Sequence, residues 1–311
     1  MNPKPVDFLE ICNSIDFEKI KDHPNILIAA NFWDEDRYKA AKTCYKLMRA
    51  IDDLVDNYKT EHSVITDEEK DMLMADVEKW INSIKSEKNN IPFVSEVIET
   101  FYKFCIPIWT MEVFAKSMIY DIKNDGFATL QSFLDYAEGA SVAPAAVYVH
   151  LCGIRKINGK YEEPVFDVRE AARACAVFSY LVHIIRDFQK DQLNNLSYFA
   201  DDLIEKHGLS RQKLKEMAYG SPILQGFRDL IAEYYAVADT YRQKTYDVIQ
   251  KIRPHLQPRY QLSLDIIFNL YFMVFERIDV TNGNFMSDEL NPTSDEVKER
   301  VLETISAFML K

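Results

Sequence analysis

The stretch "RAIDDLVDN", Arg49–Asn57, places three aspartates and an arginine within little more than two helical turns. Ile51, Leu54 and Val55 lie between them, and their spacing predicts an α-helix with one buried face. Buried carboxylates are costly unless they are paired or bind a metal. This segment therefore needs an explanation for its charge.

A helical wheel provides one explanation. Successive residues of an α-helix turn by about 100°, so Tyr45, Arg49, Asp52 and Asp56 share one narrow stripe, with Asp53 beside it. Two carboxylates one turn apart can share Mg²⁺, which takes hard oxygen ligands and completes its shell with waters and substrate phosphates. Taken alone, the motif leaves metal binding and a solvated acidic helix face equally open.

A second stretch, "YLVHIIRDFQKD" at residues 180–191, repeats this arrangement. Its apolar residues occupy the other faces of the predicted helix, and Arg186 directly precedes the first aspartate. The polar stripe consists of Tyr180, His183, Asp187 and Asp191. Two carboxylate faces on separate apolar helices predict a helical bundle with a central cavity, whose opposing walls carry the aspartates.

The composition favours an all-α protein. The chain has 311 residues, only 8 glycines and 48% hydrophobic residues, and no alternating strand-like pattern recurs. Helical periodicity predicts helices at residues 35–58, 67–85, 93–122, 127–152, 166–195, 223–252, 257–280 and 294–309. Thr66 and Thr293 each precede a glutamate at capping-box spacing, and a polar hairpin is predicted at residues 153–167. No linker or repeat divides the chain, so we expect a single domain over residues 1–311.

Several functional classes are disfavoured. The formal net charge of −12 without a basic block argues against nucleic-acid binding. Five scattered cysteines without a CxxC pattern indicate neither a disulfide framework nor a zinc site, and they favour a reducing cytoplasm. GxGxxG, P-loop and GxSxG motifs are absent from the sequence. No secretory leader or apolar run of about 18 residues is present, which leaves peripheral membrane contact open.

The two motifs resemble those of the squalene/phytoene synthase family, whose members join two prenyl diphosphates head to head. The resemblance extends from about His23 to about Asn284. The first family motif, an arginine followed by DDxxD, matches Arg49, Asp52, Asp53 and Asp56, and Tyr45 matches a tyrosine one turn earlier. The second, RDxxxD followed by a tyrosine, matches Arg186, Asp187, Asp191 and Tyr198. Asp121 and Tyr136 match an aspartate and a tyrosine that border the family's cavity.

The sequence also departs from the family pattern. His183 replaces an asparagine that resembles a metal ligand, Tyr180 replaces a glutamine, and Leu196 replaces an arginine. "ASVAPAA", at residues 140–146, stands where the family has an AGxVG-like turn. His23 and Asn25 replace small hydroxyl residues that resemble diphosphate ligands. Each change could alter the product, weaken diphosphate binding or abolish activity.

The resemblance implies an isoprenoid-synthase helical bundle and a Mg²⁺-dependent prenyltransferase. The expected substrates are two farnesyl or geranylgeranyl diphosphates, joined through a cyclopropyl diphosphate to a C30 or C40 isoprenoid. The implied metal ligands are Asp52, Asp56, Asp187, Asp191 and His183. The implied catalytic residues are these four aspartates and Tyr136. The implied substrate-binding residues are Arg49, Arg186, Tyr45, Tyr198, Asp121 and Asn25.

The product depends on how the last carbocation is quenched, which the sequence does not indicate. Hydride from NADPH gives squalene, proton loss gives dehydrosqualene or phytoene, and water gives hydroxysqualene. No membrane anchor follows Lys311, so we expect a cytoplasmic enzyme with peripheral membrane contact for product release left open. One alternative is a catalytically silent family member that acts in binding or assembly. Another is an acidic bundle in which the aspartates have no ligand.

Overall fold

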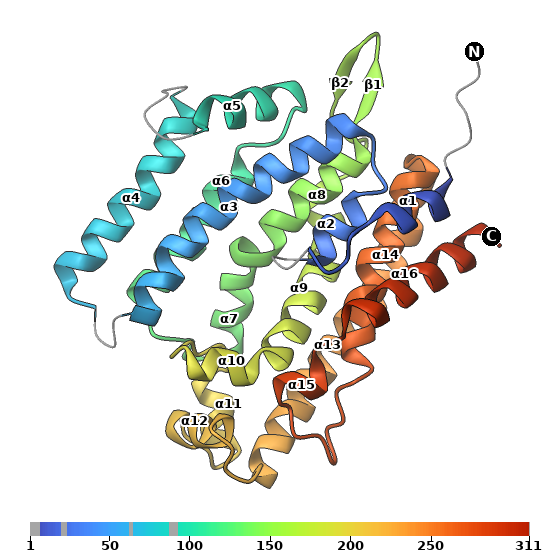
Figure 1. Ribbon diagram of the computed structural model, residues 1–311. Helices are drawn as coiled ribbons and strands as arrows, with labels where there is room; N and C mark the ends of the chain where they lie inside the picture. The colour runs from blue at the N-terminus through green and yellow to red at the C-terminus, as the bar shows by residue number, and fades with distance from the viewer. Residues whose placement is uncertain (1–6, 20–23, 62–64, 87–92, 311) are drawn as a thin grey trace.

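The computed structural model describes residues 7–19, 24–61, 65–86 and 93–310. Within these residues the regular secondary structure is helical apart from one small antiparallel hairpin, β1 (Arg155–Ile157) and β2 (Lys160–Glu162). This hairpin lies inside the polar segment predicted at residues 153–167, and in Figure 1 it projects from one end of the molecule. The all-α prediction is confirmed.

Helix α9 (Val168–Arg186) lies at the centre of the bundle, where it packs against α8 (Ala143–Gly153), α13 (Gln225–Ile252) and α14 (Pro258–Phe275) (Figure 1). Its small and aliphatic residues are buried on several faces, as expected for a helix with neighbours on all sides. Helix α3 (Glu35–Glu61) packs on the other side of α8. The first aspartate motif is therefore carried by α3, and the second lies at the end of α9.

The remaining helices surround this centre. They are α1 (Phe8–Ser14), α2 (Pro24–Ala30), α4 (Asp67–Lys85), α5 (Val94–Lys103), α6 (Trp109–Lys123), α7 (Leu130–Ala137), α10 (Phe188–Leu193), α11 (Asp201–Lys206), α12 (Arg211–Ala218), α15 (Ser287–Leu290) and α16 (Ser294–Met309). A short 3₁₀ turn, η2 (Arg253–His255), links α13 to α14. Both predicted capping boxes are present, at the starts of α4 and α16.

The helix predicted at residues 93–122 is interrupted. After α5, Cys105 adopts a left-handed conformation with φ 53°. The backbone N–H of Ile106 donates to the Phe101 carbonyl at 2.9 Å and that of Cys105 to the Tyr102 carbonyl, which is the Schellman arrangement of a helix end. Pro107 follows, and it disfavours the helical conformation of the residue before it. The apolar periodicity continues across this break, so the prediction missed it.

The helix predicted at residues 127–152 contains a π-helical turn, η1 (Glu138–Val142), between α7 and α8. Pro144 has no N–H to donate to the carbonyl four residues earlier, and its ring would crowd that carbonyl, which favours a wider turn there. A Cβ atom on Gly139 would lie 2.2 Å from both Ser117 Oγ and the Val113 carbonyl. Only glycine therefore allows η1 to lie this close to α6.

Five short helices (α1, α2, α11, α12 and α15) were not among the predicted ranges. They are too short for apolar periodicity to detect. None of the described helices is long and apolar enough to cross a membrane.

Candidate active site

A cavity of about 490 Å³ runs along the central helix α9. The α9 residues that line it change in character from one end of the helix to the other. Ala171, Ala172 and Ala176 line the part near the start of α9, whereas His183 and Arg186 line the part near its end. The cavity therefore has an apolar end and a charged end, and both aspartate motifs lie at the charged end.

The wall contributed by α3 carries the first motif. Arg49 Nη1 donates to Asp52 Oδ2 at 2.9 Å, and Nη2 bonds the Asp53 carboxylate. Asp56 makes no ion pair within the described part of the chain. Burial raises the pKa of Asp52 to about 6, against the opposing charge of Arg49, and burial together with the Asp52 charge raises the pKa of Asp56 to about 7. A cation bound beside these carboxyls would lower both pKa values.

The opposite wall carries the second motif, at a break between helices. Helix α9 ends at Arg186, Asp187 is its C-cap with φ −93° and ψ 7°, and α10 begins at Phe188. The helix predicted over residues 166–195 is therefore two helices, and the stripe is bent at Asp187. Asp191 still follows one turn later, because its N–H donates to the Asp187 carbonyl at 2.8 Å. Both aspartates line the cavity as predicted.

Asp187 is held by two basic side chains. Arg186 donates from Nε to Asp187 Oδ1 at 2.6 Å and from Nη2 to Oδ2 at 2.9 Å, and His183 Nε2 lies 3.0 Å from Oδ2. Burial opposes the charged carboxylate, but these donors outweigh it and place the pKa of Asp187 far below its usual value. Asp187 is therefore ionised without any metal.

Asp191 is in the opposite situation. Burial, followed by the negative charge of Asp187, raises its pKa to about 8, and Lys190 only partly opposes the rise. The charge of Asp56 on α3 also contributes. The two motifs thus act on each other across the cavity, as a bundle with carboxylates on opposing walls predicts.

The hydrogen bonds of His183 define its tautomer. Arg186 Nη2 lies 3.1 Å from His183 Nδ1. Because a guanidinium can only donate, Nδ1 must accept, and the ring proton is on Nε2, which donates to Asp187. Burial and the Arg186 charge lower the pKa of His183, so the ring is neutral. Both nitrogens are engaged, and a metal at His183 would have to displace Arg186 or Asp187. Its predicted role as a ligand stays a prediction.

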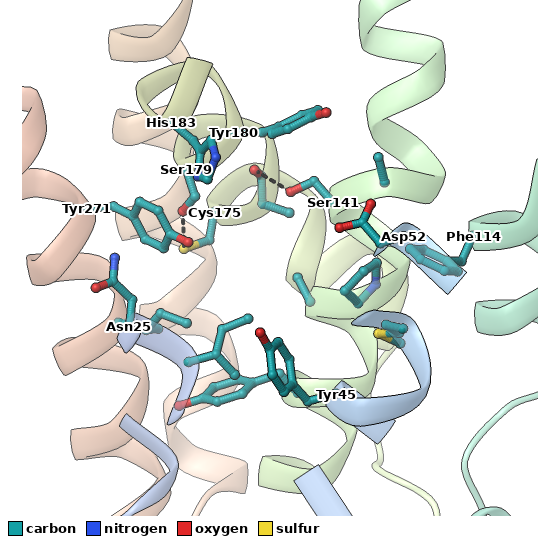
Figure 2. Close-up of a pocket in the computed structure, with 18 of the residues that line it drawn as sticks. Asn25, Tyr45, Asp52, Phe114, Ser141, Cys175, Ser179, Tyr180, His183 and Tyr271 are labelled. Atoms are coloured by element: carbon teal, nitrogen blue, oxygen red, sulfur yellow. Dashed lines mark hydrogen bonds between the residues drawn. The ribbon is translucent and has the colours of Figure 1, made fainter. Parts of the chain in front are cut away.

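Tyrosines line the cavity next to the carboxylates. The rings of Tyr136 and Tyr180 are stacked with centroids 6.3 Å apart, and Tyr198 meets Tyr180 edge-on at 6.2 Å. Burial raises the pKa of all three phenols well above the usual value, so they are neutral. Figure 2 shows Tyr180 and His183 on the α9 side of the cavity and Asp52 on the α3 side. These π faces can stabilise a positive charge between the walls.

The other predicted site residues lie in different places. Tyr45 and Asn25 line the cavity (Figure 2), and a side-chain hydrogen bond links Asn25 to the Tyr271 hydroxyl. Asp121 is buried and is not among the lining residues, and it forms an ion pair with Lys59 at 2.8 Å. Its charge still contributes to the raised pKa values of Asp52 and Asp56. His23 lies outside the described residues.

The carboxylate end suits a hard divalent cation. Its donors are carboxylate oxygens, and Asp56 and Asp191 have no cationic partner among the described side chains that would compete with an ion. Among the described residues, no group of three His, Cys, Asp or Glu side chains is arranged around one point to hold an ion. Mg²⁺ needs only one or two carboxylates from the protein, with waters and substrate phosphates completing its shell. The residues therefore fit Mg²⁺ bound together with a phosphate ligand.

Comparison with known proteins identifies the family. The model of the squalene/phytoene synthase family matches residues 21–296. The chain belongs to this family. No curated protein sequence gives a significant match.

Solved structures show the shared fold of the family. A dehydrosqualene synthase crystallised with a ligand is similar at 13% identity and a TM-score of 0.71, with 95% of each chain covered. The squalene synthase HpnC from Alicyclobacillus acidocaldarius is similar at 12% identity and a TM-score of 0.62, with 96% of this chain and 94% of that chain covered. The predicted isoprenoid-synthase helical fold is confirmed.

Some residues at the charged end were not predicted. Asn57 and Thr60 on α3 line the cavity, as do Lys190 and Asn194 on the opposite wall. Each lies three or four residues after a motif aspartate, so extending the helical stripes by one turn would have found them. Ser141 also lines the cavity, and its hydroxyl donates to the Ala176 carbonyl at 2.9 Å.

Proposed function

We propose that this protein is a Mg²⁺-dependent prenyltransferase that joins two prenyl diphosphates head to head, through a cyclopropyl diphosphate, to a C30 or C40 isoprenoid. Membership in the squalene/phytoene synthase family supports this reaction class. The observation that carries the proposal is the cavity itself. It has aspartates from two walls at one end and an apolar lining at the other, which matches a substrate with a diphosphate head and a hydrocarbon tail.

The charge of the cavity supports a requirement for metal. Among the described residues, five carboxylates line it (Asp52, Asp53, Asp56, Asp187 and Asp191), against three cationic side chains. When all five carboxylates are ionised, these described side chains carry two negative charges in excess, which repel a diphosphate. Asp52, Asp56, Asp187 and Asp191 would hold Mg²⁺ against the diphosphate. Bound Mg²⁺ would neutralise the charge that develops on the leaving group.

The protein's other contribution is to shelter a carbocation. Cleavage of the C1–O bond of one substrate releases diphosphate and leaves an allylic cation. The double bond of the second substrate attacks it, and loss of a proton closes the cyclopropane ring. Tyr136 and Tyr180 can face the cation, and each cation–π contact contributes about 2 kcal/mol when desolvated. The alanines of α9 that line the other end of the cavity place no nucleophilic side chain of their own beside the cation.

The test incubates purified protein with Mg²⁺ and farnesyl or geranylgeranyl diphosphate, with and without NADPH, and analyses the extract by mass spectrometry. We expect a C30 or C40 hydrocarbon or alcohol, or the cyclopropyl diphosphate, and its loss on addition of EDTA. Comparing the reactions with and without NADPH identifies how the last cation is quenched. Tight Mg²⁺-dependent substrate binding without any such product would instead support the catalytically silent alternative.

A further inference from the structure

We propose that Lys190 is the cationic side chain that binds the diphosphate of the substrate. This inference rests on the proposed function, because it assigns a residue to that substrate's head group. Among the described residues, three cationic side chains line the cavity, namely Arg49, Arg186 and Lys190. They differ in what they already bind.

Both arginines are committed to carboxylates. Arg49 donates to Asp52 and Asp53, and these bonds lie along a single helix face. Arg186 donates to both oxygens of Asp187 and to His183 Nδ1. The side chains of Arg186 and Asp187 are only 16% and 10% exposed, so turning Arg186 toward a phosphate would leave a buried carboxylate without its partner. The charge of each arginine is therefore already offset by a carboxylate of its own motif.

Lys190 has no such commitment. Within the described part of the chain it makes neither an ion pair nor a side-chain hydrogen bond, although it lies between Asp187 and Asp191 in α10. It is exposed, and it lines the charged end of the cavity. A lysine has three donors on a flexible stem and serves proteins as a phosphate-binding point charge. Its ammonium group can therefore approach a phosphate without releasing any protein contact.

The surroundings of Lys190 fit the same ligand. Asn194 lies one turn further on the same wall, and Asn57 and Thr60 lie on the α3 wall. Their side chains supply neutral hydrogen-bond donors around the carboxylate end. A diphosphate bound there would reach metal held by Asp56 and Asp191. It would also contact the ammonium group of Lys190, which has no partner among the described residues.

The test uses inorganic pyrophosphate as a probe, titrated calorimetrically into the full-length protein in Mg²⁺. Lys190→Gln should bind it about 10-fold more weakly, since a charge-assisted hydrogen bond is lost. Lys190→Arg should stay within about threefold, because the charge is kept. Lys79→Gln on the outer helix α4 removes the same charge away from the cavity and should have no effect. Thermal unfolding of each variant checks that folding is unchanged.

Two results would overturn the assignment. In the first, Lys190→Gln binds pyrophosphate with an affinity within about twofold of the unsubstituted protein. In the second, the unsubstituted protein itself does not bind pyrophosphate. In steady-state assays, Lys190→Gln should raise KM for the prenyl diphosphate about 10-fold and change kcat less. Pyrophosphate binding that depends on Lys190, without any C30 or C40 product, would refute the proposed function and support the Lys190 assignment. Normal product formation with unchanged KM in Lys190→Gln would support the proposed function and refute the Lys190 assignment.

Discussion

The two aspartate motifs use their arginines differently. On α3 the helix continues through the motif, so Arg49 reaches forward to Asp52 and Asp53, one turn away. At the end of α9 the helix stops, and Arg186 bonds both oxygens of the aspartate next to it in sequence. His183, one turn earlier, bonds both members of that pair.

This difference gives similar sequences different electrostatics. On α3, burial dominates, and the pKa values of Asp52 and Asp56 rise to about 6 and about 7. In the second motif, Asp187 is held ionised whereas the pKa of Asp191 rises to about 8. In each motif an arginine therefore bonds the leading carboxylates, Asp52 and Asp53 or Asp187, whereas Asp56 or Asp191 has no cationic partner among the described side chains. We infer that Asp56 and Asp191 depend more than the other carboxylates on a bound metal ion for their ionisation.

The largest effect is expected from Asp56→Asn and Asp191→Asn. Each removes a carboxylate with no arginine partner, so Mg²⁺ and the leaving group lose stabilisation, and product formation should fall by about 10²- to 10³-fold. The metal-free protein should not be destabilised, because a carboxyl that is costly to ionise has been replaced. Radiolabelled product assays and thermal unfolding measure the two effects.

Asp53→Asn is the matched control, because Asp53 lies on the same helix and is 42% exposed. It should reduce activity by less than about tenfold. Equal losses in all three variants would contradict the distinction between the two kinds of aspartate.

Asp187→Asn should be the variant that destabilises the fold. It leaves Arg186 buried without its anionic partner, so the free energy of unfolding should fall by about 3 kcal/mol. Urea unfolding of the metal-free protein measures this, with Asp191→Asn as the comparison. Equal stability of the two variants would show that the contacts of Arg186 and His183 with Asp187 do not hold the helix end in place.

The pH dependence of stability should separate the motifs further. Asp52, Asp56 and Asp191 bind protons more tightly in the folded protein, so the free energy of unfolding should fall as pH rises from about 4 to about 8. Asp187 has the opposite sign, because its contribution is present above about pH 4 and is lost in acid.

Urea unfolding of metal-free protein across this range tests both signs. Asp56→Asn should flatten the decline between about pH 5 and about pH 8, and Mg²⁺ with pyrophosphate should also reduce it. Parallel curves for Asp56→Asn and the unsubstituted protein would contradict the raised pKa of Asp56.

The smallest effect is expected from His183→Asn, which should retain Mg²⁺-dependent activity within about threefold or raise it. In this structure the ring nitrogens of His183 bond Arg186 and Asp187, and an amide can also donate and accept hydrogen bonds. Activity should be measured with Mg²⁺ and with Co²⁺, because imidazole favours the softer ion. A large loss, or a selective loss with Co²⁺, would show that His183 has a direct role at the metal.

The sequence by itself determined the helical class, the two capped helix starts at Thr66 and Thr293, and the aspartate stripes of both motifs. These features depend on residues within a turn or two of one another, so periodicity and spacing reveal them. The family resemblance also pointed to the cavity-lining tyrosines Tyr136 and Tyr198. Single-domain organisation and the catalytic roles of the site residues stay predictions.

The tertiary structure alone decided which carboxylate is paired and which is not. Asp121 forms an ion pair with Lys59, 62 positions away, instead of lining the cavity, and the charge of Asp56 acts on Asp191 from a different helix. The helix break at Asp187 lets Arg186 reach its neighbour. Burial and long-range contacts set the ionisation of these side chains, because the cost of ionising a group depends on the atoms packed around it. The amino-acid sequence alone does not show which residues those neighbours are.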